Sequence, residues 1–336
     1  MINNPTPLIS IIMPVYNGAS FIEQALRGIR NSSFQDYELI IIDDCSTDST
    51  SDIIKKYKPH IHIRNDKNQG PFVSRNIGVE HARGKIIVFT DADIEFKKDT
   101  LQKICYSMVN GDTLCLIGLY TLATLHKNIA TVYKNSWIRY SYLTSPDNAS
   151  WFFTAIGAVD RDVWDRHEGF HSSFNNDQGG DLAFGKRLVN NGISIKLDKT
   201  LEVKHLKKFS LVSLLRNDFR RAYAYTHLLG YVRNSVTTVA RKGFSNIYPR
   251  FLIATLLSGL MLLCFVLGCV SYVSLIPAGI LFFMFLFVKR GFLRYLATNI
   301  SVIFSLACIP VMLLDHLACG FGVAWGLATY PFIKRK

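Results

Sequence analysis

The segment KIIVFTDAD, residues 85–93, joins a run of apolar residues to two carboxylates separated by one alanine. The run IIVF has the length and the β-branched character of a buried strand. Asp91 and Asp93 follow at the point where such a strand would end. Two acids so close together repel each other unless a cation lies beside them. The segment therefore predicts a strand whose carboxyl end binds a cation.

The residues before this segment repeat a strand-then-helix pattern. Continuous apolar strands that alternate with helices are typical of a parallel sheet covered on both faces, so we expect an α/β fold. Ligands of such sheets bind at the carboxyl ends of the strands. The predicted strands cover residues 8–15, 37–43, 60–65 and 85–93, and the predicted helices between them cover residues 21–29, 46–57 and 70–83.

The net charge of +13 is unevenly distributed along the chain. Residues 1–198 contain 21 Lys and Arg against 22 Asp and Glu, whereas residues 199–250 contain 11 basic and 2 acidic residues. A nucleic-acid-binding protein more often spreads its basic side chains over a folded face, so we expect no nucleic-acid partner. The basic segment leads directly into apolar sequence, which is the arrangement expected beside an anionic membrane surface.

The apolar C-terminal part predicts membrane attachment. Residues 251–288 carry no charge and are long enough for two spans of about 20 residues each, with a turn near Ser271 and Pro277. A third apolar stretch, residues 295–333, follows the basic interruption at 289–294 and contains Asp315 and His316.

Basic loops favour the cytoplasmic side of a membrane. We therefore expect residues 199–250, the loop 289–294 and the last three residues, KRK, on that side. The third stretch would then have to return, as a short hairpin, a re-entrant segment or an interfacial helix. No signal peptide is expected, because the N-terminal residues lack a basic region and a cleavage site. The seven cysteines show no metal-ligand spacing and fit a reducing compartment.

Several motifs occur in one order along the first 205 residues. They are PVYN at 14–17, IIIDDCSTDST at 40–50, NQGPFVSRNIG at 68–78, FTDAD at 89–93 and GGDLAFGKRL at 179–188. Together they resemble the family 2 glycosyltransferases of the GT-A fold, over roughly residues 8–205, and the apolar stretches resemble those of membrane-attached members. The resemblance implies a Rossmann-like nucleotide-sugar-binding domain at 1–205, a basic amphipathic juxtamembrane segment at 206–250 and a membrane region with transmembrane helices at 251–336.

The resemblance also implies a divalent metal, Mn²⁺ or Mg²⁺, which matches the oxygen ligands that hard cations prefer. Asp91 would face the ribose or the metal, and Asp93 would bind the metal. His205, in LEVKH, resembles a histidine that contacts the metal or the diphosphate in some members. The alternatives are a solvated turn with capping acids and a structural histidine.

Further residues are assigned to the donor by the same resemblance. Asp44 would accept a hydrogen bond from the base, Tyr16 would stack on it, and Pro14 and Asn17 would shape the loop. Arg75 would contact phosphate with its planar fork. The alternatives are that Asp44 caps the helix predicted at 46–57 and that Arg75 forms a surface ion pair.

Asp181 is the candidate catalytic base. The family places an acidic residue six positions before an Arg, and Asp181 precedes Arg187 by six. The family's usual Glu-Asp pair is Gly180–Asp181 here, so the acidic neighbour is missing. The alternative is an N-cap for the following helix. Trp151, Phe152 and Phe153 are expected to line the acceptor side, or else to fill the core.

These residues lead us to expect an inverting glycosyltransferase with a nucleotide-sugar donor. The catalytic domain would face the cytoplasm, in a multi-pass protein of the cytoplasmic (inner) membrane whose partners include membrane lipids. The acceptor would be a hydroxyl of a lipid-linked or cell-surface saccharide. The alternatives are a polyprenyl-phosphate glycosyltransferase and a non-catalytic membrane scaffold that binds nucleotide-sugar. A processive synthase is disfavoured, because no Gln-x-x-Arg-Trp motif follows residue 200.

Overall fold

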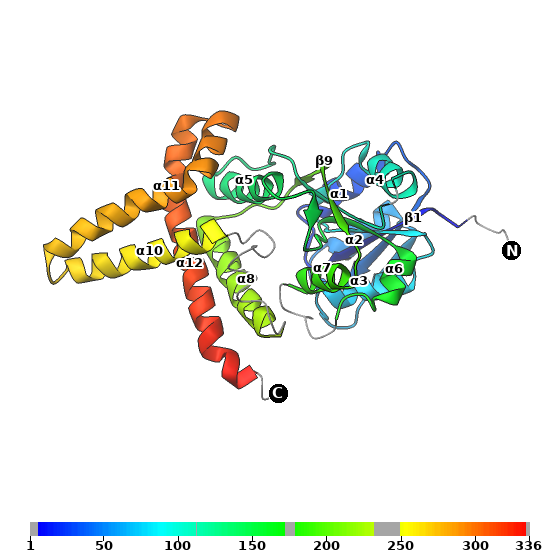
Figure 1. Cartoon of the computed structure of the whole chain (residues 1–336). Helices are drawn as coiled ribbons and strands as arrows, with labels where there is room; N and C mark the ends of the chain where they lie inside the picture. Colours follow the sequence, from blue (N-terminus) through cyan, green and yellow to red (C-terminus); the bar gives the residue numbers. More distant parts are fainter. Residues whose placement is uncertain (1–5, 112, 172–178, 232–248, 334–336) are drawn as a thin grey trace. The chain divides into compact units, whose positions relative to one another are not determined.

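The computed structural model of the chain describes residues 6–111, 113–171, 179–231 and 249–333 (Figure 1). The chain divides into two compact units. The first is formed by residues up to 126 together with 142–207, and the second by residues 127–141 together with those from 208 onwards. Residues 127–141 therefore group with the C-terminal helices, although they lie within the sequence range predicted for the catalytic domain.

Four parallel strands form one half of the sheet in the first unit. They are β1 (Ile9–Val15), β2 (Tyr37–Asp43), β3 (Ile61–Arg64) and β4 (Ile86–Thr90), in the spatial order β3-β2-β1-β4. The connecting helices are α1 (Ile22–Arg30), α2 (Thr50–Tyr57) and α3 (Pro71–Glu80). The predicted parallel α/β sheet is confirmed. Because the chain turns back across β1 to reach β4, the carboxyl ends of β1 and β4 lie at a topological switch point.

In the other half of the sheet, the sequence predicted only a strand at ISIKLD, residues 193–198, which is part of β9. β8 (Ile156–Asp160) lies antiparallel to β4, and β6 (Cys115–Tyr120) follows it. The segments ISIKLD and LEVKH form one long strand, β9 (Ile195–His205), which pairs with β6, with β5 (Ile94–Glu95) and with the short β7 (Asn148–Ala149). The remaining helices of this unit are α4 (Thr100–Val109), α6 (Arg161–Arg166) and α7 (Gly180–Asn190).

An aromatic cluster fills the core on one face of this sheet. The ring of Phe152 lies 5.9 Å from that of Phe89 and 5.4 Å from that of Phe184, and its side chain is fully buried. Trp151 is also buried, against Tyr142. The prediction that Trp151 and Phe152 line the acceptor side is therefore wrong, since both side chains stabilise the core.

The second unit is helical. It contains α5 (Ile129–Leu143, of which residues up to 141 belong here), α8 (Leu211–Tyr231), α10 (Pro249–Gly268), α11 (Leu275–Asn299) and α12 (Val302–Ile333). Among the described residues, α10, α11 and α12 are long and apolar enough to cross a membrane.

Two details of the predicted membrane region are corrected. Lys289, Arg290 and Arg294 lie inside α11 and not in a loop. The third stretch begins with the last residues of α11, and from Val302 it is one continuous helix, α12, so it does not form a short hairpin or a re-entrant segment. The turn predicted near Ser271 is present between α10 and α11, whereas Pro277 lies in the first turn of α11, a position that tolerates proline.

Candidate functional site

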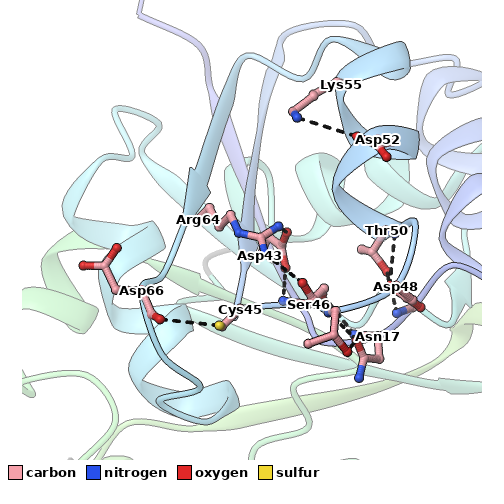
Figure 2. A network of polar contacts seen from close by, with 12 residues as sticks. Asn17, Asp43, Cys45, Ser46, Asp48, Thr50, Asp52, Lys55, Arg64 and Asp66 are labelled. Atoms are coloured by element: carbon pink, nitrogen blue, oxygen red, sulfur yellow. Dashed lines mark hydrogen bonds and ion pairs between the residues drawn. The ribbon is translucent and has the colours of Figure 1, made fainter.

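The loop after β1 is fixed to the loop after β2 (Figure 2). Asn17 has a positive φ of 50°, and its Oδ1 accepts a hydrogen bond of 2.8 Å from the Thr47 backbone N–H. Its own N–H donates to Ser46 Oγ at 3.0 Å. Pro14 is buried in β1, and Tyr16 projects from the loop with 51% of its surface exposed. The side chain of Tyr16 is therefore available to a ligand at the edge of the sheet.

Asp43 closes the turn at the end of β2. Its Oδ1 accepts a 2.8 Å hydrogen bond from Ser46 N–H, and its Oδ2 forms a 3.1 Å ion pair with Arg64 (Figure 2). The N-cap of α2 is Ser49, so Asp43 does not cap that helix. The buried carboxylate instead holds the loop in the shape that brings it to Asn17.

Asp44 organises a second loop, the one between β3 and α3. Its Oδ1 accepts hydrogen bonds from Asn65 Nδ2 at 2.7 Å and from Gln69 N–H at 2.9 Å, and its Oδ2 accepts one from Gly70 N–H at 2.8 Å. The side chain is buried, and it does not cap α2. A contact between Asp44 and a nucleotide base stays a prediction, and the carboxylate has a structural role besides it.

Arg75 pairs with the first carboxylate of the Asp-x-Asp segment. Its guanidinium forms a hydrogen-bonded ion pair with Asp91 Oδ1 directly after β4, and its side chain is only 4% exposed. Arg75 is therefore not a surface ion pair. Burial raises the pKa of Asp91, although the charge of Arg75 opposes this shift. The pair places one cationic fork at the carboxyl end of β4.

Asp93 faces His205. The short strand β5 brings them together, because Ile94 pairs with His205 and the Leu206 N–H donates to the Asp93 carbonyl at 2.8 Å. His205 Nε2 lies 3.5 Å from Asp93 Oδ2, and the imidazole stacks on the ring of Tyr120 at 4.6 Å. Burial acts to raise the pKa of Asp93, but the neighbouring His205 holds it below the ordinary value.

These side chains fit a divalent cation that takes only part of its ligands from the protein. The carboxylate oxygen of Asp93 and the imidazole nitrogen of His205 are close enough to bind one ion together, and both atom types are common metal ligands. Within the described part of the chain, no three His, Cys, Asp or Glu side chains form a complete metal site. A cation held here would complete its coordination with phosphate oxygens or water, as Mg²⁺ commonly does.

Asp181 lies in the first turn of α7, two residues after the N-cap, which is Gly179. It therefore does not act as the predicted N-cap. Its Oδ1 accepts a 2.9 Å hydrogen bond from the Leu182 N–H. A Cβ atom added to Gly180 would lie 2.8 Å from the ring of Phe72, in α3. The ring of Phe72 thus takes up the space in which the family's acidic neighbour would begin.

Two further residues support the site, and of these only Tyr120 was not singled out from the sequence. Tyr120 stacks on His205, and Asn76 holds the segment that follows α6 by exchanging two hydrogen bonds with the Phe170 backbone, at 2.7 and 3.1 Å. Tyr120 could have been found as the last residue of the apolar run CLIGLY, because strands of this sheet place their final residues at the ligand edge.

Known proteins share this architecture. The sequence model of the family described as Glycosyl transferase family 2 matches residues 10–161. A putative teichuronic acid biosynthesis glycosyltransferase, TuaG of Bacillus subtilis, is 40% identical over 104 residues, which is 30% of this chain and 41% of that protein. The poly(ribitol-phosphate) beta-N-acetylglucosaminyltransferase TarS of Staphylococcus aureus is 31% identical over 99 residues, which is 28% of this chain and 17% of that protein.

A solved structure extends the comparison to the whole fold. The mannosyltransferase PcManGT from Pyrobaculum calidifontis, solved in complex with GDP-Man and Mn²⁺, superposes with a TM-score of 0.59 at 14% identity and covers 98% of this chain and 89% of that one. The match to the curated relatives is shorter, since it spans half or less of their length. Together with the parallel sheet and the Asp-x-Asp segment after β4, the family match shows that residues 10–161 of this chain form a family 2 glycosyltransferase domain.

Proposed function

We propose that this protein transfers a sugar from a nucleoside-diphosphate-sugar to a hydroxyl of a saccharide acceptor, with inversion, at the cytoplasmic face of a membrane. The observation that supports this most directly is the grouping of Arg75, Asp91, Asp93 and His205 at the carboxyl end of β4. One arginine fork, two carboxylates and an imidazole suit a diphosphate and a divalent cation better than any neutral ligand.

The donor occupies the edge formed by the loops after β1, β2 and β4. Tyr16 offers an exposed aromatic ring on which the base stacks. The hydrogen bonds of Asn17 to Ser46 and Thr47 hold the loop that carries this ring. Arg75 binds a phosphate oxygen when the donor enters, because its planar fork matches that geometry. Asp93 and His205 would hold the cation, and Asp91 would face it or the ribose. When bound, the cation stabilises the negative charge of the departing diphosphate.

The acceptor hydroxyl loses its proton to Asp181 as it attacks the anomeric carbon. A carboxylate within hydrogen-bond reach of that hydroxyl contributes about 10²- to 10⁴-fold as a general base. Because attack and departure occur in one displacement, the anomeric centre inverts and no nucleophilic side chain of the protein is needed.

The acceptor belongs to a cell-surface polysaccharide or its lipid-linked precursor. The names of TuaG and TarS, which concern teichuronic acid and poly(ribitol-phosphate), favour an envelope polymer. The apolar helices α10 and α11 favour an acceptor held at the bilayer. If the acceptor were a polyprenyl phosphate, its nucleophile would already be ionised, and Asp181 would not be needed as a base.

Release of nucleoside diphosphate from a panel of UDP-, GDP- and dTDP-sugars tests the proposal. The full chain in detergent is supplied with Mn²⁺ or Mg²⁺ and a membrane lipid extract, and then with EDTA. We expect turnover of one donor, its loss with EDTA and in Asp93→Ala, and a fall of at least about 100-fold in Asp181→Asn. Full activity of Asp181→Asn would favour the phosphate acceptor, and donor binding without turnover would favour a scaffold.

A further inference from the structure

The hairpin of α10 and α11 exposes many large apolar side chains along both helices. Leu263, Phe265, Val266, Phe283 and Phe287 are all between 54% and 71% exposed within the unit. The distance along α11 from the tip at Tyr272 to Lys289 is about 25 Å at 1.5 Å per residue. This depth approaches the about 30 Å of a bilayer's hydrocarbon core. The hairpin is therefore suited to enter the membrane.

The helix α8 carries charges that exclude it from hydrocarbon. Arg216 and Arg220 are exposed. Asp218 is buried and pairs with Lys134 of α5. Charged side chains in the middle of a 21-residue helix prevent that helix from crossing a bilayer. It fits an interfacial position, where the arginines reach the headgroups.

The second half of α12 runs beside α8 and in the same direction. Cys319 Sγ lies 3.9 Å from the Asp218 carbonyl oxygen, and a Cβ on Gly322 would collide with the Phe219 carbonyl oxygen. One turn further, a Cβ on Gly326 would lie 2.8 Å from the Thr226 Cβ. This glycine seam keeps α12 in close contact with α8, so the two helices share one depth in the membrane.

The first half of α12 is also attached to charged surroundings. Ser305 Oγ donates a 2.8 Å hydrogen bond to the Leu293 carbonyl of α11, next to the exposed Arg290 and Arg294. These two arginines lie beyond the exposed part of the hairpin, where headgroups are expected. Both halves of α12 are therefore held by elements that carry exposed arginines.

Polar residues occur at the centre of α12. Asp315 Oδ2 accepts a 2.7 Å hydrogen bond from Tyr133, and His316 Nδ1 lies 2.9 Å from Thr255 Oγ1. If α12 crossed the bilayer, this pair would lie near the midplane, where ionisable groups are costly. At the membrane surface, Asp315 and His316 carry no such cost. Their partners, Tyr133 of α5 and Thr255 of α10, attach α12 to the base of the hairpin.

Exposed apolar side chains occur around much of α12, including Val302, Val323 and Leu327, and five others form one stripe along the helix. Ile303, Leu306, Leu314, Phe321 and Trp325 are 42% to 81% exposed, at a spacing close to the helical repeat, and the polar residues Ser305, Asp315 and His316 are buried on the other side. Figure 1 shows α12 running in a different direction from α10 and α11. A hairpin that enters the bilayer therefore leaves α12 inclined towards the membrane plane.

We propose that α12 does not cross the membrane but lies in its interface beside α8, with the apolar stripe from Ile303 to Trp325 turned towards the acyl chains. Only the α10–α11 hairpin then enters the hydrocarbon. The occupant of the stripe is the interfacial region of an anionic bilayer, since Arg216, Arg220, Arg290 and Arg294 supply the complementary charge. The inference rests on the membrane attachment in the proposed function and not on its chemistry.

The number of crossings can be tested without measuring activity. The full chain is expressed in a bacterial inner membrane with one protease-sensitive tag before residue 1 and another after residue 336. We expect both tags to be cleaved in inverted vesicles and neither in intact spheroplasts, because a hairpin returns the chain to its starting side. Tags on opposite sides would mean that α12 crosses, and the proposal would be overturned.

The depth of α12 is measured with brominated lipids in proteoliposomes. The Trp325→Phe background keeps Trp137, Trp151 and Trp164, and its emission is subtracted. The remaining signal of Leu314→Trp then reports the centre of α12, and that of Leu263→Trp is the matched control in α10. We expect Leu314→Trp to be quenched most by bromine near the headgroup and Leu263→Trp by bromine deeper in the chains. Equal deep quenching of both would place α12 in the hydrocarbon and contradict the interfacial position. Activity plays no part in either readout, so inactive preparations would count against the proposed function alone.

Discussion

The aromatic ring of Phe72 fills the space beside Gly180, on the first turn of the helix that carries Asp181. Restoring the family's acidic neighbour with Gly180→Glu should therefore destabilise the protein by about 1–3 kcal/mol through overpacking. Chemical denaturation of the detergent-solubilised chain would measure the loss. The double variant Gly180→Glu with Phe72→Ala should lose less stability than the sum of the losses of the two single variants, because the smaller side chain makes room for the glutamate. A loss equal to that sum would show that the two sites do not interact.

The site at Asp93 and His205 predicts a metal requirement that can be separated from general charge loss. Asp93→Asn should lower donor turnover by at least about 100-fold, since it removes a charged ligand from the cation. Asp99→Asn is the matched control, because Asp99 is exposed and pairs with Lys103. The dependence of turnover on Mn²⁺ concentration would shift in the first variant and stay unchanged in the second. A normal Mn²⁺ dependence in Asp93→Asn would remove Asp93 from the metal site.

Arg75 cannot be replaced by another cation without loss. Arg75→Lys keeps a positive charge beside Asp91 but removes the planar fork, so we expect donor affinity to fall about 10-fold or more. Arg75→Gln also leaves Asp91 without its partner and should lower the melting temperature in addition. Titration calorimetry with the donor and thermal unfolding distinguish the two effects. Equal affinity in wild type and Arg75→Lys would argue against a phosphate contact.

Glu38 gives the first unit a defined acid sensitivity. Burial acts to raise the pKa of Glu38, but hydrogen bonds from Ser10 and Arg83 together with the Arg83 charge hold it below its ordinary value. A lowered pKa means that the carboxylate stabilises the fold at pH 7 and that this contribution is lost as the pH falls below about 4.5. Glu38→Gln should lower the free energy of unfolding at pH 7 by about 1–2 kcal/mol. It should also make that free energy fall less steeply between pH 5 and 3, the range around the ordinary pKa of a glutamate. The same difference in the free energy of unfolding between wild type and Glu38→Gln at every pH would contradict this.

The buried pair Lys134–Asp218 joins α5 to α8 in the second unit. Lys134→Met alone should cost about 3–5 kcal/mol, because it removes the cation that is hydrogen-bonded to a buried carboxylate. The double variant Lys134→Met with Asp218→Leu should recover most of that loss. Thermal unfolding in one detergent compares them with Lys127→Met, a substitution in the same unit. A double variant as unstable as the single one would show that Asp218 is needed for another reason.

The sequence predicted the half of the sheet whose strands are long apolar runs, and it failed where strands are held by distant partners. β4 was recognisable from IIVF alone, whereas β8 lies in the segment WFFTAIGAVD, whose aromatic residues also suit a binding surface. The grouping of Arg75 with Asp91 could not be read from the chain either, because the contact depends on how α3 is placed over the sheet. The order of the motifs predicted which residues are candidates for the site, whereas tertiary packing determines which side chains they contact.

The three hydrogen bonds received by Asp44 have a consequence for mutagenesis of this protein. An alanine scan would score Asp44 as essential whether or not it contacts a nucleotide, because the substitution also releases the loop that ends at Gly70. Substitutions in this loop are therefore tolerated better at its exposed residues, such as Asp66 and Lys67, than at the carboxylate that anchors it. The exposed side chains of the loop between β3 and α3 can therefore change in evolution while Asp44 continues to hold its backbone.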